Sequence, residues 1–198
     1  MLVRQAFFFF IIGFKKGYLK MRALLIINVQ QGFLNPKQPI RNNKDAESNM
    51  LRLMEHCRQK EDLVIHIQHL GTAEDSFFLS EKNRTFQKGF GPQGDEKVIQ
   101  KFVNSAFIGT DLEEYLHQQG IHELIIVGLT LPHCVSTTTR MAANLGFDVT
   151  LIEDATATYA LLDQNGNWLD PQKIHLYNLA ALNHEFAKIM TTQEFLDM

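Results

Sequence analysis

The sequence predicts an α/β fold built on a parallel, doubly wound sheet. Short apolar runs alternate with helical segments from Arg22 onward, which is typical of strand–helix–strand units. The first run, ALLIIN, is continuously apolar, as in a strand that is buried on both faces. At 198 residues, the chain is long enough for one domain with a substantial core.

The first part of the chain predicts two strands and one helix. Residues 23–28 (ALLIIN) form the first strand, and a proline-containing loop follows it. Residues 45–60 carry apolar side chains at helical spacing. Residues 63–68 (LVIHIQ) form the second strand. Residues 71–94 are polar and interrupted by Gly and Pro, which predicts a long excursion beside a site.

The second part continues the alternation. A helix over residues 110–119 is predicted to begin at a Thr-x-x-Glu capping box, Thr110 and Glu113, and to end at Gly120. The C-terminal helix has a proline at a favoured first-turn position. The other predicted elements are three strands and one helix, at residues 98–102, 124–129, 148–153 and 134–145. The C-terminal helix itself spans residues 171–188.

Residues 1–20 do not continue this pattern. Residues 6–14 read AFFFFIIGF, which is too short to span a bilayer, and most of the positive charge follows the run, unlike in a signal peptide. We expect residues 1–20 to be an extension outside the fold, with a mis-set translation start as the preferred account and a short membrane or partner anchor as the alternative. Residues 21–198 form the predicted domain.

Composition narrows the function classes. The formal net charge is -3 and no basic stripe occurs, so we expect neither a nucleic-acid nor a membrane-surface partner. Two cysteines make no disulfide framework, which favours a reducing, cytoplasmic location. No GxGxxG or P-loop pattern is present, so no nucleotide cofactor is expected.

Three polar residues lie at or just beyond carboxyl ends of predicted strands: Asn28, Lys101 and Cys134. Parallel sheets bind ligands at that edge, so these residues can converge on one pocket. A helix start and a nearby ammonium both favour a thiolate, which makes Cys134 a candidate nucleophile. The alternatives are a buried cysteine that caps a core helix, a solvated lysine and a hydrogen-bonding asparagine.

Three segments carry a family resemblance: ALLIINVQQGFL, KFVNSAF and IIVGLTLPHCVSTTTRMAANLGFDVTLIEDATAT. With these motifs the chain resembles the isochorismatase-like cysteine hydrolase superfamily, which includes nicotinamidases and other small-amide hydrolases. The resemblance covers Arg22 to about Leu196. It implies a Rossmann-like three-layer sandwich with a mostly parallel sheet of about six strands, and a homo-oligomer.

The resemblance also implies an Asp, Lys and Cys triad, of which Lys101 and Cys134 match the last two members. It implies a cis peptide between Leu129 and Thr130, and an oxyanion hole made by the N–H groups of Thr130 and Cys134. Asn28 stands where the family has Asp. A carboxamide can orient Lys101 by hydrogen bonding, but it cannot move a proton. Protonation of the leaving group should suffer, since such help is worth about 10²–10⁴-fold.

Further pocket residues follow from the resemblance. Phe33, His69, Phe107 and His133 are expected near the substrate, with a core role as the alternative for both phenylalanines and a plain loop histidine as the alternative for His69. The metal-bearing relatives use an Asp-x-His motif, which is missing around His69. We therefore expect no metal.

We expect a cofactor-independent cysteine hydrolase that cleaves a small amide or related C–N bond through a thioester acyl-enzyme. Asn28 leaves a second hypothesis open, a catalytically inactive small-molecule-binding or scaffold homologue. Isochorismatase-type vinyl-ether hydrolysis is a third, and it fits less well because it depends on the missing Asp. The sequence does not specify the small-molecule substrate.

Overall fold

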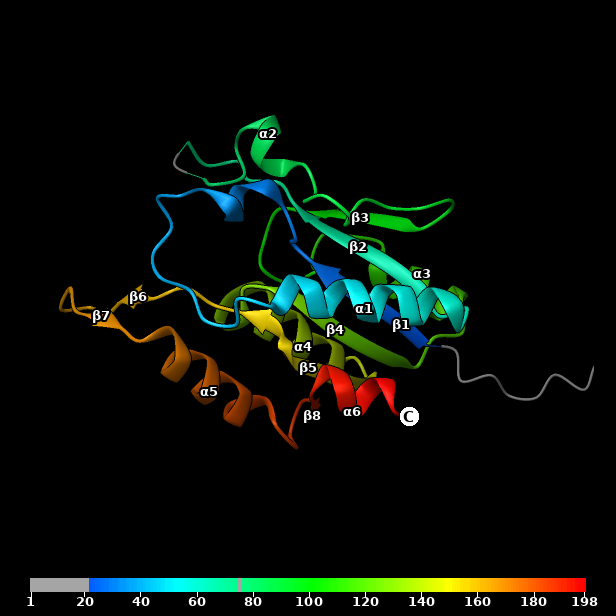
Figure 1. Ribbon diagram of the computed structural model, residues 1–198. Coiled ribbons are helices and arrows are strands. Elements are labelled where there is room, and N and C mark those ends of the chain that lie inside the picture. The colour runs from blue at the N-terminus through cyan, green and yellow to red at the C-terminus, as the bar shows by residue number, and fades with distance from the viewer. Residues whose placement is uncertain (1–21, 75) are drawn as a thin grey trace, which may run out of the picture.

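A six-stranded sheet forms the centre of the molecule, and all its strand pairs are parallel (Figure 1). The computed structural model describes residues 22–74 and 76–198, so the predicted extension at residues 1–20 lies outside the described residues. The sheet order is β3-β2-β1-β4-β5-β8. The strands are β1 (Arg22–Ile27), β2 (Leu63–His69), β3 (Lys97–Lys101), β4 (Glu123–Leu129), β5 (Asp148–Ala157) and β8 (Lys188–Met190). The predicted doubly wound sheet is confirmed.

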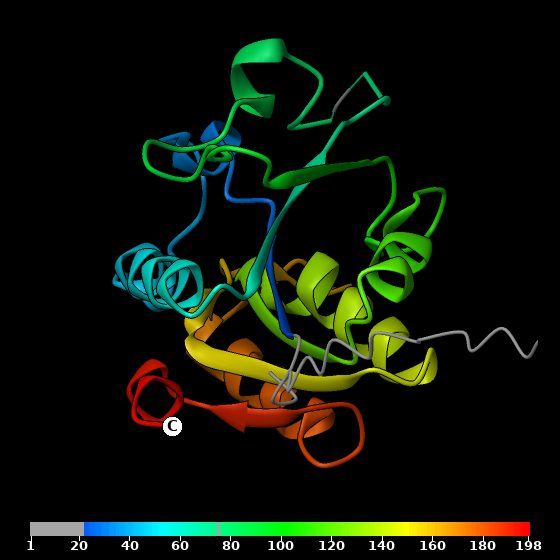
Figure 2. The same cartoon turned by 90° about the vertical axis from the view of Figure 1, so that its right-hand side faces the viewer.

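Helices cover both faces of this sheet and make a three-layer sandwich (Figure 2). The side chains of β1 alternate between two cores, because successive residues of a strand point to opposite faces. One core packs against α1 (Ala46–Gln59) and α6 (Thr192–Leu196). The other packs against α3 (Leu112–Gln118), α4 (Ser136–Asn144) and α5 (Pro171–Leu182). This burial on both faces explains the continuously apolar strands.

Shorter elements complete the fold. A 3₁₀ helix, Gln31–Leu34, follows β1, and a π-helical turn, Leu131–Val135, joins β4 to α4. The short helix α2 (Glu81–Arg84) lies in the predicted excursion between β2 and β3. The strands β6 (Leu161–Leu162) and β7 (Trp168–Leu169) form an antiparallel hairpin. In the described part of the chain, no helix has the length and apolar character needed to cross a membrane.

The helix boundaries predicted at residues 110 and 188 are wrong. The helix at 110–119 has no capping box, because Thr110 Oγ1 donates to the carbonyl of Ala106 at 2.6 Å and α3 begins only at Leu112. The C-terminal helix ends at Leu182 rather than at residue 188. The chain then turns through His184, which has a φ of 67°, and pairs as β8 along β5. The residues after Leu182 therefore pair with the edge of β5 instead of extending the helix.

Candidate functional site

The carboxyl ends of the central strands gather the predicted reactive residues. His69 and Lys101 are the last residues of β2 and β3 and lie opposite each other in the parallel register. Asn28 follows β1 directly, and Cys134 lies in the π-helical turn after β4. Since β1 pairs with both β2 and β4, these strand ends are neighbours. This is the sheet edge at which open α/β folds bind ligands.

Lys101 and Cys134 are in direct contact. The Nζ atom of Lys101 donates to Cys134 Sγ at 3.3 Å, and the lysine side chain is fully buried. The same Nζ donates to the carbonyl of Val103 at 2.9 Å and lies 3.0 Å from His69 Nδ1. An ammonium has three protons to donate, so each has one partner here. The arrangement fits a charged lysine beside the sulfur of Cys134.

The electrostatics of the site follow from its burial. Desolvation lowers the pKa of Lys101, and the neighbouring Cys134 opposes that shift. Burial and the charge of Lys101 together lower the pKa of His69 to about 4. Burial also lowers the pKa of His133. At neutral pH, both of these imidazoles are therefore uncharged, and Lys101 supplies the positive charge beside the sulfur.

The turn that carries Cys134 depends on a glycine. Gly128 has a φ of 126°, and a Cβ there would lie 2.2 Å from the carbonyl oxygen of Ile27. Strand β4 can therefore run close to β1 only with glycine at this position. The Leu129–Thr130 peptide bond that follows is cis. The carbonyl of Thr130 then accepts from the N–H groups of His133 and Val135, which closes the turn around Cys134.

The structure corrects the expectation that Cys134 opens an α-helix. The residue lies inside the π-helical turn, two positions before α4 begins at Ser136. The sequence pattern could not distinguish a π turn from a first α turn, because both place the same residues on one side over so short a span. Cys134 is 7% exposed, so the residue is buried but retains some access to solvent.

Asn28 is buried without a partner for its side chain. Its φ is 55° and its main-chain N–H donates to the carbonyl of Ile67 at 2.9 Å. The carboxamide oxygen and nitrogen form no hydrogen bond to any described residue. The expectation that Asn28 orients Lys101 by hydrogen bonding is therefore wrong. An unpaired buried amide costs roughly 1–3 kcal/mol, so this position is not optimised for stability.

A cavity of about 180 Å³ opens next to the cysteine turn. Phe33, Thr130 and His133 line it, as does Tyr159. The rings of Phe33 and Tyr159 are stacked with centroids 6.0 Å apart, and the Tyr159 hydroxyl donates to the carbonyl of Phe33. The Thr130 hydroxyl lies 3.0 Å from His133 Nδ1. Two of the predicted pocket residues, Phe33 and His133, thus line the same cavity.

The other two predicted pocket residues lie elsewhere. Phe107 stacks against Phe147 in the core that contains α3 and α4, and it does not line this cavity. His69 Nδ1 contacts Lys101 Nζ, and His69 does not line the cavity either. The core alternative therefore describes Phe107, and His69 contacts the lysine instead of the cavity.

Three residues near the site carry no prediction from the sequence. Gln30 is fully buried; its side chain accepts from the N–H of His69 and donates to the carbonyls of His69 and Arg84. Asn104 Oδ1 lies 3.8 Å from Cys134 Sγ. Tyr159 lines the cavity. Gln30 and Asn104 both stand within the family motifs, three residues beyond the ends of β1 and β3, and a polar residue close after a strand end is the signal that could have identified them.

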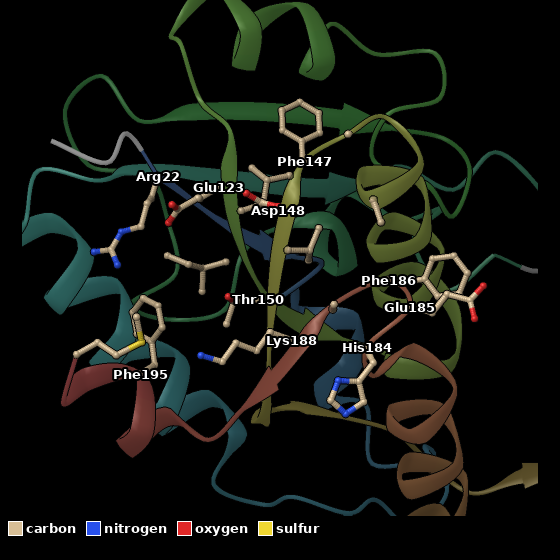
Figure 3. Close-up of a pocket in the computed structure, with 17 residues that line it drawn as sticks. Arg22, Glu123, Phe147, Asp148, Thr150, His184, Glu185, Phe186, Lys188 and Phe195 are labelled. Carbon is tan, nitrogen blue, oxygen red and sulfur yellow. The ribbon is translucent and has the colours of Figure 1, made fainter. Parts of the chain in front are cut away.

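Larger cavities lie away from the cysteine. Figure 3 shows one of about 600 Å³ that is lined by Arg22, Glu123, Asp148 and Lys188. These residues stand at or near the amino ends of β1, β4, β5 and β8, at the opposite edge of the sheet from Cys134. Parallel sheets place their reactive groups at the carboxyl edge, so the smaller cavity beside Thr130 is the substrate candidate.

The described residues hold no group of three or more His, Cys, Asp or Glu side chains that could bind a metal ion. His66 is fully buried, with Nε2 2.8 Å from Glu96 Oε2, and its ring packs against Phe86. Gln68 donates to the carbonyl of Arg84. Of the two histidines of β2, His66 therefore contacts Glu96 and Phe86, and His69 contacts Lys101.

Comparisons with known proteins agree with this geometry. The family model of the isochorismatase domain matches residues 22–194. YrdC, an isochorismatase family protein of Bacillus subtilis (strain 168), is 46% identical over 89% of this chain and 95% of its own length. Nicotinamidase 3 of Arabidopsis thaliana is 30% identical over 71% of this chain and 75% of its own length. The crystal structure of an isochorismatase from Pseudomonas putida KT2440 has a TM-score of 0.81 at 33% identity, covering 89% of this chain and 90% of that one.

Proposed function

Because the chain belongs to the isochorismatase family of hydrolases, we propose that it is a cysteine hydrolase that cleaves a small amide or a related C–N bond. The observation that carries the proposal is the contact of 3.3 Å between Lys101 Nζ and Cys134 Sγ. A buried ammonium on a sulfur favours the thiolate, which is the nucleophilic form. The likeness to a nicotinamidase supports an amide as substrate.

The proposed reaction has two halves. The Cys134 thiolate attacks the amide carbonyl carbon, and the N–H groups of Thr130 and Cys134 stabilise the resulting oxyanion. The C–N bond then breaks, the amine leaves with a proton, and a thioester remains on Cys134. Water attacks the thioester, the C–S bond breaks, and the carboxylic acid is released. No cofactor takes part in either half.

The cavity favours a small, uncharged acyl group. At about 180 Å³ it is smaller than the pockets of about 300–1,000 Å³ that hold drug-sized ligands. Its lining has no carboxylate and no guanidinium, and His133 is neutral because burial lowers its pKa. The aromatic rings of Phe33 and Tyr159 provide an apolar wall. A charged acyl group would lose its hydration there without gaining a counter-ion.

Trapping the acyl-enzyme tests this proposal. Mixing the protein with p-nitrophenyl acetate should add one acetyl group to Cys134, visible by intact mass and peptide mapping, and a panel of neutral primary amides should be hydrolysed. The Cys134→Ala variant should show neither result. Acetylation spread over surface lysines, or amide turnover that persists in Cys134→Ala, would contradict a Cys134 nucleophile.

The unpaired carboxamide of Asn28 favours a second candidate, a binding protein that keeps the pocket without turnover. The variant Asn28→Asp separates the two. Comparable amide hydrolysis by the wild type and the variant supports the hydrolase. Activity confined to Asn28→Asp would instead mark the natural chain as a binding homologue.

A further inference from the structure

The His69 imidazole lies within hydrogen-bond distance of the Lys101 ammonium. Resting on the proposed function, we propose that His69 takes over the proton-holding task of the missing carboxylate and acts through Lys101 on the reacting atoms. Three atoms form a continuous chain: His69 Nδ1, 3.0 Å from Lys101 Nζ, and Cys134 Sγ, 3.3 Å beyond. Asn28 takes no part in this chain, since its carboxamide bonds to no described residue.

The contact with Lys101 fixes the state of the imidazole. An ammonium nitrogen can only donate, so His69 Nδ1 must present its lone pair and the ring proton must lie on Nε2. A histidine in this tautomer is a base aimed at the lysine. It can receive a proton along the existing hydrogen bond without any change of rotamer.

The basicity of His69 matches the role. Its pKa is about 4, close to the value of about 3.9 for an ordinary aspartate. The shift comes from burial and from Lys101. The other cation nearby, the Arg84 guanidinium, donates to the carbonyls of Phe78 and Gly71. The groups that pack against His69 from the neighbouring segments, Gln30 and the Phe78 ring, are neutral.

The proton balance closes over one turnover. A thiol, an ammonium and a neutral imidazole become a thiolate, an ammonium and an imidazolium, because Nζ gives a proton to His69 as it takes the one on sulfur. The imidazolium returns the proton through Nζ to the leaving nitrogen as the C–N bond breaks. In the second half, the proton of the attacking water follows the same route and ends on the Cys134 sulfur. An imidazolium with so low a pKa is a strong acid toward an amine.

The neighbours of His69 hold it in this position. Gln30 bonds both main-chain groups of His69, at 2.8 Å to its N–H and 3.0 Å to its carbonyl. The Phe78 ring lies 5.3 Å from the imidazole, centroid to centroid. The parallel register of β2 and β3 places His69 opposite Lys101. Backbone, ring contact and register therefore all direct Nδ1 at the lysine.

The substitution His69→Asn tests the proposal. It keeps an acceptor near the position of Nδ1, so Lys101 retains a partner, but an amide cannot hold the proton. Two substrates with the same acyl group separate the effects: a primary amide, whose leaving group needs a proton, and a p-nitrophenyl ester, whose leaving group does not. We expect amide hydrolysis to fall about 100-fold or more and ester hydrolysis less than tenfold.

The double variant His69→Asn with Asn28→Asp tests whether a carboxylate can replace the imidazole as the holder of the proton. A carboxylate at position 28 should restore amide hydrolysis to within about tenfold of the wild type, which a merely structural role of His69 does not predict. The exposed His122→Asn is the matched control and should behave as the wild type. Amide and ester rates that fall together in His69→Asn without rescue, or an unchanged amide rate, overturn the proton-carrier role alone. A wild type that turns over neither substrate overturns the proposed function and this role with it.

Discussion

At the residue scale, the two cysteines of this chain have different surroundings. Cys134 touches the Lys101 ammonium. Cys57 lies on α1 in the opposite core, where burial raises its pKa to about 12. A thiol with so high a pKa carries almost no thiolate at neutral pH. Position along the chain says nothing about this difference, and packing decides it.

This contrast gives an internal control for labelling. At pH 7, iodoacetamide should modify Cys134 and leave Cys57 unmodified, as measured by peptide mass mapping over time. Lys101→Met removes the ammonium and should slow the labelling of Cys134 about tenfold or more. Equal labelling of both cysteines in the folded protein would show that Cys134 has no special activation.

The meeting of Lys101 and Cys134 could be predicted from the sequence, but their other contacts could not. Lys101 and Cys134 follow apolar strands, so their place at the carboxyl edge follows from the fold class. The contact between His69 and Lys101 depends on the register of β2 against β3, and neither strand encodes that register locally. The isolation of Asn28 likewise depends on side-chain packing that a residue type does not specify.

At the element scale, the approach of β4 to β1 sets the geometry of the cysteine turn. Gly128 makes the approach possible, because any Cβ would meet the backbone of Ile27. Gly146, just after α4, also has a positive φ of 89°, but nothing lies within 4 Å of its added Cβ. The two glycines share a backbone requirement and differ in steric contact.

Their alanine variants should therefore differ in stability. Gly146→Ala should lower the free energy of unfolding by about 1 kcal/mol, the cost of a positive φ for a residue with a Cβ. Gly128→Ala adds a backbone clash and should cost at least about 3 kcal/mol more, or prevent folding. Urea denaturation followed by circular dichroism measures both. Equal losses would mean that β4 can move away from β1 at little cost.

Strands with long apolar runs can be predicted from the sequence, and strands of two or three residues cannot. The four inner strands β2, β1, β4 and β5 are predictable because their apolar runs are buried on both faces. The three residues of β8 and the two-residue strands β6 and β7 carry too few positions for a period. A capping box does occur at the start of α6, where Thr191 is the N-cap and Glu194 its partner, whereas the Thr110 hydroxyl donates to the carbonyl of Ala106. Capping motifs are short enough to occur by chance.

At the scale of the whole molecule, one apolar surface stands out. It comprises the β6–β7 hairpin and part of α5, and the hairpin lies at the start of that helix (Figure 1). Its large apolar residues are exposed: Leu162, Trp168, Leu169, Leu176 and Tyr177. Trp168 is 62% exposed and Tyr177 67%. Exposed apolar patches of this kind mark protein interfaces, so we propose that a homo-oligomer forms through this surface.

Light scattering after gel filtration tests this proposal. The wild type should have a mass of at least twice the 22.7 kDa of one chain. Trp168→Glu places a charge in the proposed interface and should shift the protein to the monomer, while the exposed Leu79→Glu in the excursion should not. A monomeric wild type at micromolar concentration would rule out this interface.

The Gln30 amide joins the proton chain to the loop that borders the site. It bonds His69 on one side and the carbonyl of Arg84, the last residue of α2, on the other. A shortened or lengthened loop that displaced Arg84 would pull on the same amide that aims His69 at Lys101. Changes of loop length that move Arg84 should therefore lower amide hydrolysis more than changes that leave Arg84 in place. The Arg84 carbonyl thus holds in place the amide that positions His69.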